Sequence, residues 1–479
     1  MTSGWSGNDI RVVDTDTFSV ARFWDEREDR RLAMTSCNLG HVTPAAFSSL
    51  PTLRSLRLAD NPRLPRDDLL AAIRRVDTLR KLDVSSSLMF RRTFDLAELF
   101  YLDSAAGLRL EELMVAGNGI RTVSMNMSTA GMVGTLRSLD LAYNELTTLD
   151  GGLSLLRRLE RLSVRRNRLT RIDRDAVIGL DWLMTLDVSY NELEKLDDGA
   201  LRSLTRLRRL NLAGNRLRTL SPTAVPPRLE VLSVRDNHLV SVVFLTSLAH
   251  LRSVDVSGNG LICLDAHLFS QYIRSPVSAN FSHNEISSID GQAFVGVAFS
   301  VLDLTGNRLT RLSLYGADAV NVLRADDNLI CDVDDEVFHA TRDLHLANNW
   351  LRSLRTLCDS DSQFGSSSSP IEVSSPKSLD NTHVNLVEND VCTSSTSERT
   401  RLDGQLAEVS SPEIATQSGT TAQRSSPRVL VLDISGNPNL GPSLDSQHRN
   451  CYSLVDLCSP LSSSSRSSLP QTSSFPTYF

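Results

Sequence analysis

The chain has 479 residues, of which 41% are hydrophobic and 5% aromatic, and its formal net charge is −7 at pH 7. At roughly 100–200 residues per domain, this length predicts several compact domains unless the chain is a repeat array. The mild acidity argues against nucleic acid as the main partner. No stretch approaches the roughly 18 apolar residues of a membrane span. The first twenty residues lack the basic, apolar and small-residue order of a secretory signal, so the sequence as written predicts a soluble, cytoplasmic chain.

Residues 1–30 are predicted to form an N-terminal capping element. Apolar side chains alternate at Ile10 and Val12 and again at Phe18 and Val20, and the charged run DEREDRR follows at 25–31. An array of stacked strands has an open end that such an element would cover.

One pattern, L-x-x-L-x-L-x-x-N-x-L, recurs through most of the remaining chain. Clean copies include LRSLDLAYNEL from Leu136, LERLSVRRNRL from Leu159 and LRRLNLAGNRL from Leu207. Between Asn118 and Asn349 the asparagines are 21 to 26 residues apart. With weaker copies the sequence contains fifteen units, whose asparagine position is occupied by Cys37, Asn61, Ser87, Asn118, Asn144, Asn167, Asn191, Asn215, Asn237, Asn259, Asn284, Asn307, Asn328, Asn349 and Asn437.

The pattern itself predicts stacked coils. In L-x-L the two leucines face the same way, as a strand requires, and one unit cannot bury that face alone, so neighbouring units must share a core. The asparagine stands where the chain turns off the strand, and a buried amide there can satisfy backbone groups of its own coil and the adjacent one. Cys37 and Ser87 can do this only weakly, so we expect looser coils at these two positions.

These units resemble the leucine-rich repeat superfamily over about residues 31–357 and again over 429–440. Several units continue as L-x-x-L-x-x-x-x-F, for example from Leu261 to Phe269, which resembles the typical subclass of about 24 residues. The resemblance implies an α/β-type repeat solenoid, a curved horseshoe with a parallel concave sheet of one strand per repeat and a mostly irregular or short-helix convex side. Surface members of the family usually carry cysteine-cluster caps, and this sequence has none.

The resulting division of the chain has further segments. We predict about 14 repeats in 31–358, a Ser-rich disordered insert in 359–427, a final repeat with a C-terminal cap in 428–458, and a disordered tail in 459–479. The insert contains four Ser-Ser-Pro sequences. Such sites are accessible to a proline-directed kinase, and an unmodified linker is the alternative.

The sequence carries no recognisable catalytic or cofactor signal. HExxH, GxSxG, GxxxxGK[ST] and GxGxxG are absent, and the seven cysteines show no C-x-x-C pair. We therefore predict no enzyme activity, no cofactor and no metal. The acidic residues between Asp326 and Glu336 match no known calcium loop, and Asp343 with His345 is interpreted as charged strand surface in preference to a catalytic pair.

The informative positions are those two, four and six residues before each asparagine, which the resemblance places on the concave face. Arginine binds carboxylates through paired hydrogen bonds and is enriched at interfaces. An arginine patch on the coils of Asn167–Asn237 is therefore predicted to bind an acidic protein partner. The alternative is that these arginines belong to an ordinary soluble surface, built as the repeats diverged in sequence. The candidate partner-binding residues are Arg161, Arg165, Arg166, Arg209, Arg235, Asp303, Asp326 and His345.

The function that follows is a non-enzymatic protein-interaction scaffold, with no nucleic-acid ligand and with the oligomeric state undetermined. The alternative is the ectodomain of a cell-surface recognition or adhesion receptor that lacks its signal and anchor. Two sequons, at Asn126 and Asn280, would then be glycosylated, whereas in a cytoplasmic chain they are accidents. A third interpretation, a regulatory arm of an enzyme encoded elsewhere, has no supporting residues.

Overall fold

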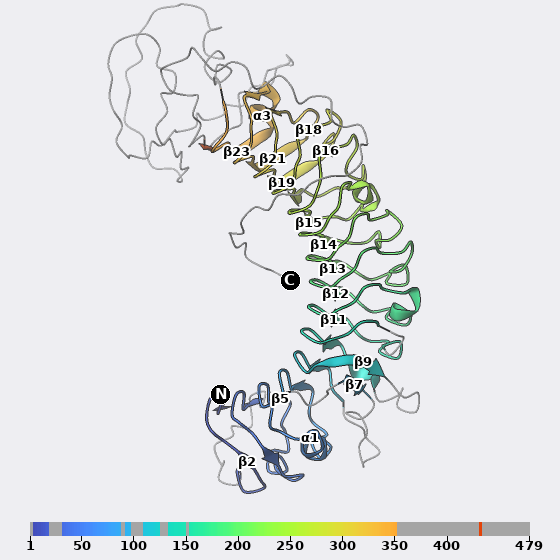
Figure 1. The fold of residues 1–479 in the computed structure, drawn as a ribbon, viewed down its shortest axis with the longest axis vertical. Helices are drawn as coiled ribbons and strands as arrows, with labels where there is room; N and C mark the ends of the chain where they lie inside the picture. The colour runs from blue at the N-terminus through green and yellow to red at the C-terminus, as the bar shows by residue number, and fades with distance from the viewer. Residues whose placement is uncertain are drawn as a thin grey trace, which may run out of the picture.

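The structure is a computed structural model that describes residues 3–18, 31–87, 92–96, 109–124, 133–149, 153–351 and 431–433. In these residues the chain winds into coils stacked along one axis, and Figure 1 shows the stack bent into an arc. The predicted insert (359–427) and tail (459–479) lie outside the described residues, as does most of 428–458. No helix in the described ranges combines the length and the apolar character needed to cross a bilayer.

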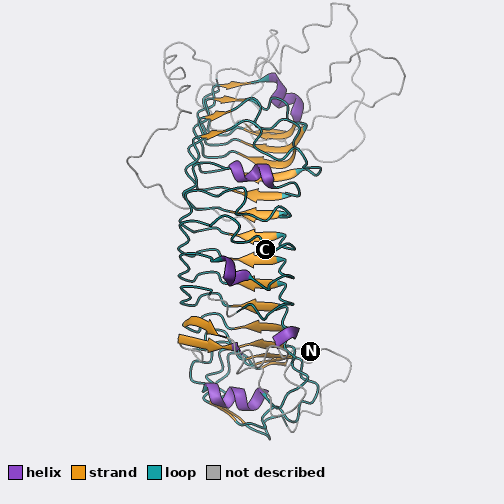
Figure 2. Cartoon of the chain, turned by 90° about the vertical axis from the view of Figure 1, so that its right-hand side faces the viewer, coloured by secondary structure: helices purple, strands orange, loops and turns teal. Residues whose placement is uncertain are grey.

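The inner side of the arc is one parallel sheet of sixteen short strands, stacked like rungs in Figure 2. Each of the fifteen units supplies one strand, and β1 adds another in front of them, so the predicted parallel solenoid is confirmed. In spatial order the strands are β1 (Ser3–Gly4), β3 (Arg31–Ala33), β5 (Ser55–Arg57), β6 (Lys81–Asp83), β8 (Glu112–Met114), β10 (Ser138–Asp140), β11 (Arg161–Ser163), β12 (Thr185–Asp187), β13 (Arg209–Asn211), β14 (Val231–Ser233), β15 (Ser253–Asp255), β17 (Val277–Asn280), β19 (Ala298–Asp303), β21 (Ala319–Arg324), β23 (Thr341–His345) and β24 (Val431–Asp433).

The remaining path of each coil is mostly irregular. Four small two-stranded sheets join neighbouring coils, and short helices occur away from the main sheet. The small sheets are β2 (Val12–Val13) with β4 (His41–Val42), β7 (Arg92–Asp95) with β9 (Ile120–Ser124), β16 (Cys263–Leu264) with β18 (Ser288–Ile289) and β20 (Arg311–Leu312) with β22 (Asp332–Val333). The helices are α1 (Arg66–Ile73), α3 (Asp335–Ala340) and the 3₁₀ turns η2 (Val133–Thr135), η3 (Arg174–Val177) and η4 (Val243–Ser247).

The core is a continuous ladder of aliphatic side chains between the sheet and the outer wall. Leu139 pairs in register with Leu113 on one side and Leu162 on the other, and the three are almost fully buried. Aromatic rings fill the outer part of the core in the later coils, where Phe299 contacts both Phe269 and Phe294 edge to face. Because every coil shares its apolar face with two neighbours, no single coil has a core of its own.

The repeated asparagines connect successive coils. Asn144 donates from Nδ2 to the carbonyls of Leu141 and Ala142 in its own coil, at 2.9 and 3.1 Å, and to Val115 in the preceding coil, at 3.1 Å. Its Oδ1 accepts the backbone N–H groups of Asn118 and Ile120, at 2.9 and 3.1 Å. One side chain thus satisfies five backbone groups where the chain leaves the strand.

The two units without asparagine make fewer of these bonds. The Ser87 hydroxyl donates to the carbonyls of Leu58 and Ser85 at 3.3 and 3.2 Å and accepts the N–H of Asn61 at 3.3 Å. The Cys37 thiol lies 3.0 Å from the Trp5 carbonyl, on the N-terminal segment. Serine and cysteine therefore replace only part of the hydrogen bonds that an asparagine makes at this position, as the sequence predicts.

A turn in the left-handed backbone region immediately precedes each asparagine position. In all fourteen described units the residue there has φ between 52° and 67°, which costs a side chain with a Cβ roughly 1–2 kcal/mol. Glycine avoids this cost at Gly117, Gly214, Gly258 and Gly306. We call this series the edge row, and it comprises Ser36, Asp60, Ser86, Gly117, Tyr143, Arg166, Tyr190, Gly214, Asp236, Gly258, His283, Gly306, Asp327 and Asn348.

Replacing one asparagine tests the role of the amide. We expect Asn144→Ala to lower the free energy of unfolding by about 1–3 kcal/mol, because it leaves buried backbone groups without a partner. Urea denaturation followed by circular dichroism measures the change. Asn321→Ala is the matched control, since Asn321 is exposed on β21, and an equal loss in both variants would contradict the assignment.

Candidate protein-binding surface

A row of carboxylates and amides runs along the middle of the concave sheet, four residues before the asparagine. We call it the central row, and its members are Asp83, Asp140, Asp187, Asn211, Asp255, Asn280 and Asp303. In each, Oδ1 accepts the backbone N–H two residues later, at 2.9–3.1 Å. The main role of these side chains is therefore to close the turn at the end of the strand. The negative charge in the middle of the concave face is a consequence of that role.

Two carboxyls of the central row have altered acidity. Burial raises the pKa of Asp140 above its ordinary value, and the nearby carboxylates of Asp187 and Asp83 act in the same direction. Burial likewise raises the pKa of Asp255, although hydrogen bonds from Ser257 oppose it. Ionisation of these two groups at neutral pH thus works against the folded state.

Two of the five predicted arginines form ion pairs with carboxylates of this chain. Arg161, on β11, lies 3.4 Å from Glu112, which belongs to β8 two strands away. Arg235 lies 3.0 Å from Asp236, the next residue along the chain. Both remain accessible, but part of their charge is already compensated.

The other three arginines make no ion pair with any described residue. Arg209 is exposed on β13. The guanidinium of Arg165 lies over the ring of Tyr190 at 4.7 Å, and that of Arg166 lies 4.9 Å from the same ring and 5.3 Å from the ring of Tyr143. Arg165 Nε is buried without a hydrogen-bond partner. These cations are the uncompensated part of the predicted patch.

Tyr143 and Tyr190 are absent from the residues that the sequence singled out, yet they lie among its arginines. Their side chains are 56% and 38% exposed, and both belong to the edge row. The signal was available in the sequence, because a bulky residue stands at a position where several other units have glycine.

The predicted acidic residues and His345 form a second, separate group. Asp303, Arg324 and His345 occupy the same register position on β19, β21 and β23. Arg324 lies 4.0 Å from Asp303, which is only 4% exposed, and Asp326 accepts the backbone N–H of Ala347 at 2.7 Å. Strands β15 and β17 separate this group from the arginines, so the eight candidates do not form one site.

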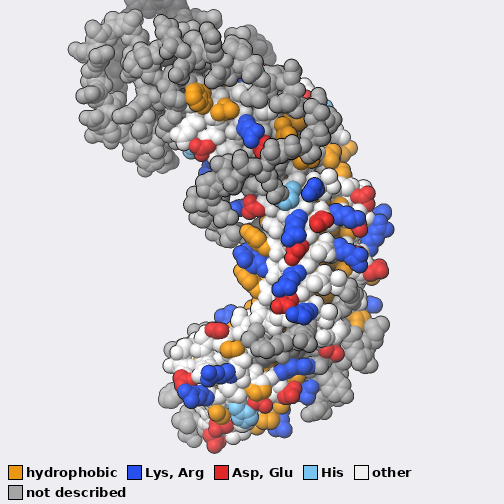
Figure 3. Space-filling model, in the orientation of Figure 1, with side chains coloured by type: hydrophobic (Ala, Val, Ile, Leu, Met, Phe, Trp, Pro, Cys, Tyr) orange, Lys and Arg blue, Asp and Glu red, His pale blue; other side chains and the backbone are white. Residues whose placement is uncertain are grey.

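The opposite edge of the sheet, where the strands begin, carries charges that pair with one another. Arg137 binds Glu160 at 2.5 Å, and Glu230 binds Arg208 as well as Arg252, the latter at 3.9 Å. Alternating cationic and anionic side chains are also visible on the face of the solenoid shown in Figure 3. The charges at this edge are thus balanced locally, whereas Arg165, Arg166 and Arg209 form no ion pair with a described residue.

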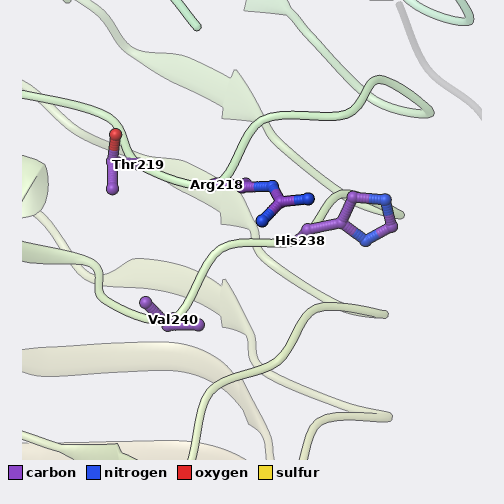
Figure 4. Close-up of a pocket in the computed structure, with 4 residues that line it drawn as sticks. All are labelled: Arg218, Thr219, His238 and Val240. Carbon is purple, nitrogen blue, oxygen red and sulfur yellow. The ribbon is translucent and has the colours of Figure 1, made fainter. Parts of the chain in front are cut away.

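An open depression of about 410 Å³ lies beside the turns that follow two successive strands. Arg218 and Thr219 from one coil and His238 and Val240 from the next line it, with the Arg218 guanidinium directed toward the His238 ring (Figure 4). Its shallow, exposed form does not enclose a small molecule.

The described residues also contain no group of three side chains able to hold a metal ion. Two of the acidic residues between Asp326 and Glu336 are engaged elsewhere: Asp334 binds Arg311 at 2.6 Å, and Asp327 accepts a hydrogen bond from Asn348. Of the described cysteines, Cys37 is buried, and Cys263 and Cys331 are half-buried.

A family model described as leucine rich repeat matches residues 157–217, in the middle of the confirmed solenoid. The chain is a leucine-rich repeat protein. The fifteen units and their asparagine ladder extend this assignment beyond the matched residues.

Several curated leucine-rich repeat proteins are similar to the chain. Mouse podocan is 27% identical over 66% of this chain and 50% of its own length. Human podocan-like protein 1 is 28% identical over 70% of this chain and 64% of its own length. Bovine osteomodulin is 27% identical over 37% of this chain and 42% of its own length. The chain thus spans between half and two thirds of the podocan relatives. Podocan and osteomodulin are secreted extracellular-matrix proteins, which favours the extracellular alternative over the cytoplasmic expectation.

Solved structures agree on the fold. The Toll chain of the Drosophila Toll–Spatzle complex superimposes with a TM-score of 0.56 at 20% identity, over 71% of this chain and 45% of that chain. A glycosylated form of the same complex gives 0.54 at 18% identity, over 75% and 53%. At this identity the likeness establishes the leucine-rich repeat architecture alone.

The raised pKa values lead to a pH-dependent prediction. Because the folded state holds the Asp140 and Asp255 protons to higher pH than the unfolded chain does, their contribution to stability is present below the unfolded pKa and lost as pH rises through the folded pKa. We expect Asp140→Asn and Asp255→Asn to stabilise the protein at pH 7, because the amide keeps the hydrogen bond that Asn211 already makes and carries no charge.

The gain in stability of the two asparagine variants should disappear near pH 3, because the aspartic acid side chain of the wild type is then uncharged like the amide. Urea unfolding of wild type and variants across this range provides the measurement. Asn211→Asp is the reverse control and should lose stability at pH 7 but not at low pH. A gain in Asp140→Asn that does not change with pH would contradict the burial argument.

Proposed function

We propose that this leucine-rich repeat chain is a non-enzymatic binding protein that holds a protein ligand on its concave face, over the coils of β11–β14. The observation that carries the proposal is the set of Arg165, Arg166 and Arg209, which lie within three successive coils, those of β11–β13, and form no ion pair with any described residue. A partner that supplies carboxylates would form ion pairs with these three arginines.

The architecture favours such a role on energetic grounds. Each coil is fixed to two neighbours by strand pairing and by an asparagine, so the side chains of the concave face are held in place before a ligand arrives. A preorganised surface loses little conformational entropy on binding. In the Toll–Spatzle complex, Toll presents a solenoid of the same fold, which is a precedent for partner recognition by this architecture.

The chemistry of the unpaired residues favours an acidic partner. Arginine is always charged and offers a planar set of donors that matches a carboxylate, and arginine and tyrosine are enriched at the centres of protein interfaces. No catalytic step is part of the proposal, and podocan and osteomodulin are likewise non-enzymatic binding proteins.

A second candidate is that the chain works outside the cell, as a matrix protein or as the recognition part of a receptor. The secreted relatives favour it. Asn126 lies outside the described residues, whereas Asn280 belongs to the central row, where its Oδ1 accepts the N–H of Ser282 at 2.9 Å. A glycan on Asn280 would project from the concave face, and peptide mapping by mass spectrometry after secretory expression tests for it.

Charge reversal tests the proposed surface. We expect Arg165→Glu or Arg209→Glu to weaken binding to an affinity-captured protein partner at least tenfold, about 1.4 kcal/mol, because each places a carboxylate where the partner's would lie. Arg161→Glu and Arg235→Glu should have smaller effects, since their charges are partly compensated by Glu112 and Asp236. Surface plasmon resonance on the purified pair measures the dissociation constants.

Arg216→Glu is the matched control, because Arg216 is exposed, lies after the strand and pairs with Glu192 at 3.1 Å. Its binding should stay within about twofold of wild type. Equal affinities for wild type and both Arg165→Glu and Arg209→Glu would remove the basis for the proposed surface.

A further inference from the structure

Three successive members of the edge row form a stack at the end of strands β10, β11 and β12. Tyr143, Arg166 and Tyr190 come from neighbouring coils, and the Arg166 guanidinium lies between the two rings, at 5.3 and 4.9 Å from their centres. The Tyr190 ring in turn lies against Gly214 of the next coil, where an added Cβ would come within 2.7 Å of it. The stack is therefore ordered before any ligand binds.

All three residues occupy the left-handed backbone region, with φ of 55°, 52° and 55°. The turn itself does not require them, because glycine makes the same turn at Gly117 and Gly214 on either side. Large side chains kept in a conformation that disfavours them, and exposed to solvent, indicate a role outside the fold.

The electrostatics of the stack are incomplete. Arg165 and Arg166 place two guanidinium groups over one ring, that of Tyr190, and no described carboxylate pairs with either. A guanidinium stacked on a ring keeps its edge donors free, and two cations side by side attract an anion that can bridge them. The tyrosine rings beside them offer apolar contact area at small entropic cost.

We propose that Tyr143, Arg165, Arg166 and Tyr190 form a docking site for an acidic segment of a protein partner, with the carboxylate bound between the two guanidiniums and adjacent side chains packed on the rings. This rests on the proposed function and deepens it by naming the anchor and the chemistry of the ligand.

The central row decides between a short acidic segment and a long polyanion such as a sulfated polysaccharide. Asp140 and Asp187 lie on β10 and β12, the same coils that present Tyr143 and Tyr190. A continuous polyanion crossing the concave face would meet these carboxylates, whereas a protein segment can place an acidic group over the arginines and basic or neutral groups over the central row.

The site can be tested without knowing the natural partner. A displayed library of random peptides is selected on the full-length chain, and the enriched peptides are measured against variants by fluorescence anisotropy. We expect the enriched peptides to contain Asp or Glu beside apolar residues. Tyr143→Gly, Tyr190→Gly and Arg166→Lys should each weaken their binding at least tenfold, the last because lysine keeps the charge but not the planar donors.

Thermal denaturation separates a binding role from a structural one. Tyr143→Gly and Tyr190→Gly should leave Tm unchanged or raise it, because glycine relieves the left-handed conformation, whereas residues that support the fold would lower it. Arg216→Ala, which removes a cation that already pairs with Glu192, is the control and should not change peptide binding.

The outcomes are distinguishable. Peptides without acidic enrichment, or peptides unaffected by Tyr143→Gly and Arg166→Lys, overturn the docking site. If such peptides still lose binding in Arg209→Glu, the proposed concave-face function stands and only the anchor is wrong, whereas insensitivity to all of these variants removes both. Binding of heparin that depends on Arg166 and displaces the selected peptides, or a library that yields no binder, also overturns the proposal.

Discussion

The stack depends on one polar contact repeated along its length, the side-chain amide that joins the irregular backbone of one coil to the next. A strand three residues long provides few hydrogen bonds, and the turn that follows it leaves backbone groups inside the molecule. Asn144 satisfies five of them across two coils. Without this contact the aliphatic ladder would still favour collapse, but it would not fix the coils at one spacing and one register.

The features of the concave face follow from this constraint. Because the amide must point inward, the residue before it turns into the left-handed region, and its side chain stands at the edge of the sheet. Because the strand ends there, an Asp or Asn four positions earlier can close the turn with its own oxygen, as it does in the seven units of the central row. A row of carboxylates beside a row of edge side chains is thus a product of folding, and any ligand meets both.

Much of this could be predicted from the sequence, and the rest could not for a physical reason. Periodic leucines and asparagines define the strands, their order and the buried ladder, since these depend on spacing alone. The pairing of Arg161 with Glu112 was not predictable in the same way, because the two residues are two strands apart and meet only through the side-by-side placement of coils. The sequence placed Arg165 and Arg166 correctly near one another, but their contact with Tyr143 and Tyr190 depends on the turn geometry, which the repeat pattern does not display. Asp303 was expected to be available to a partner, whereas it accepts a backbone hydrogen bond and is almost fully buried.

The modular stacking has an evolutionary consequence. The strand pairing and the core of each coil involve mainly the coil before and the coil after it, so duplication or loss of one repeat would leave both remaining halves intact. Such an event between Tyr190 and Asp303 would translate the group around Asp303 and His345 along the axis by one strand spacing, about 4.7–4.9 Å, relative to the tyrosine–arginine stack. The distance between two groups of side chains on the concave face can therefore change in discrete steps between descendants of one gene, while the chemistry of each group is inherited unchanged.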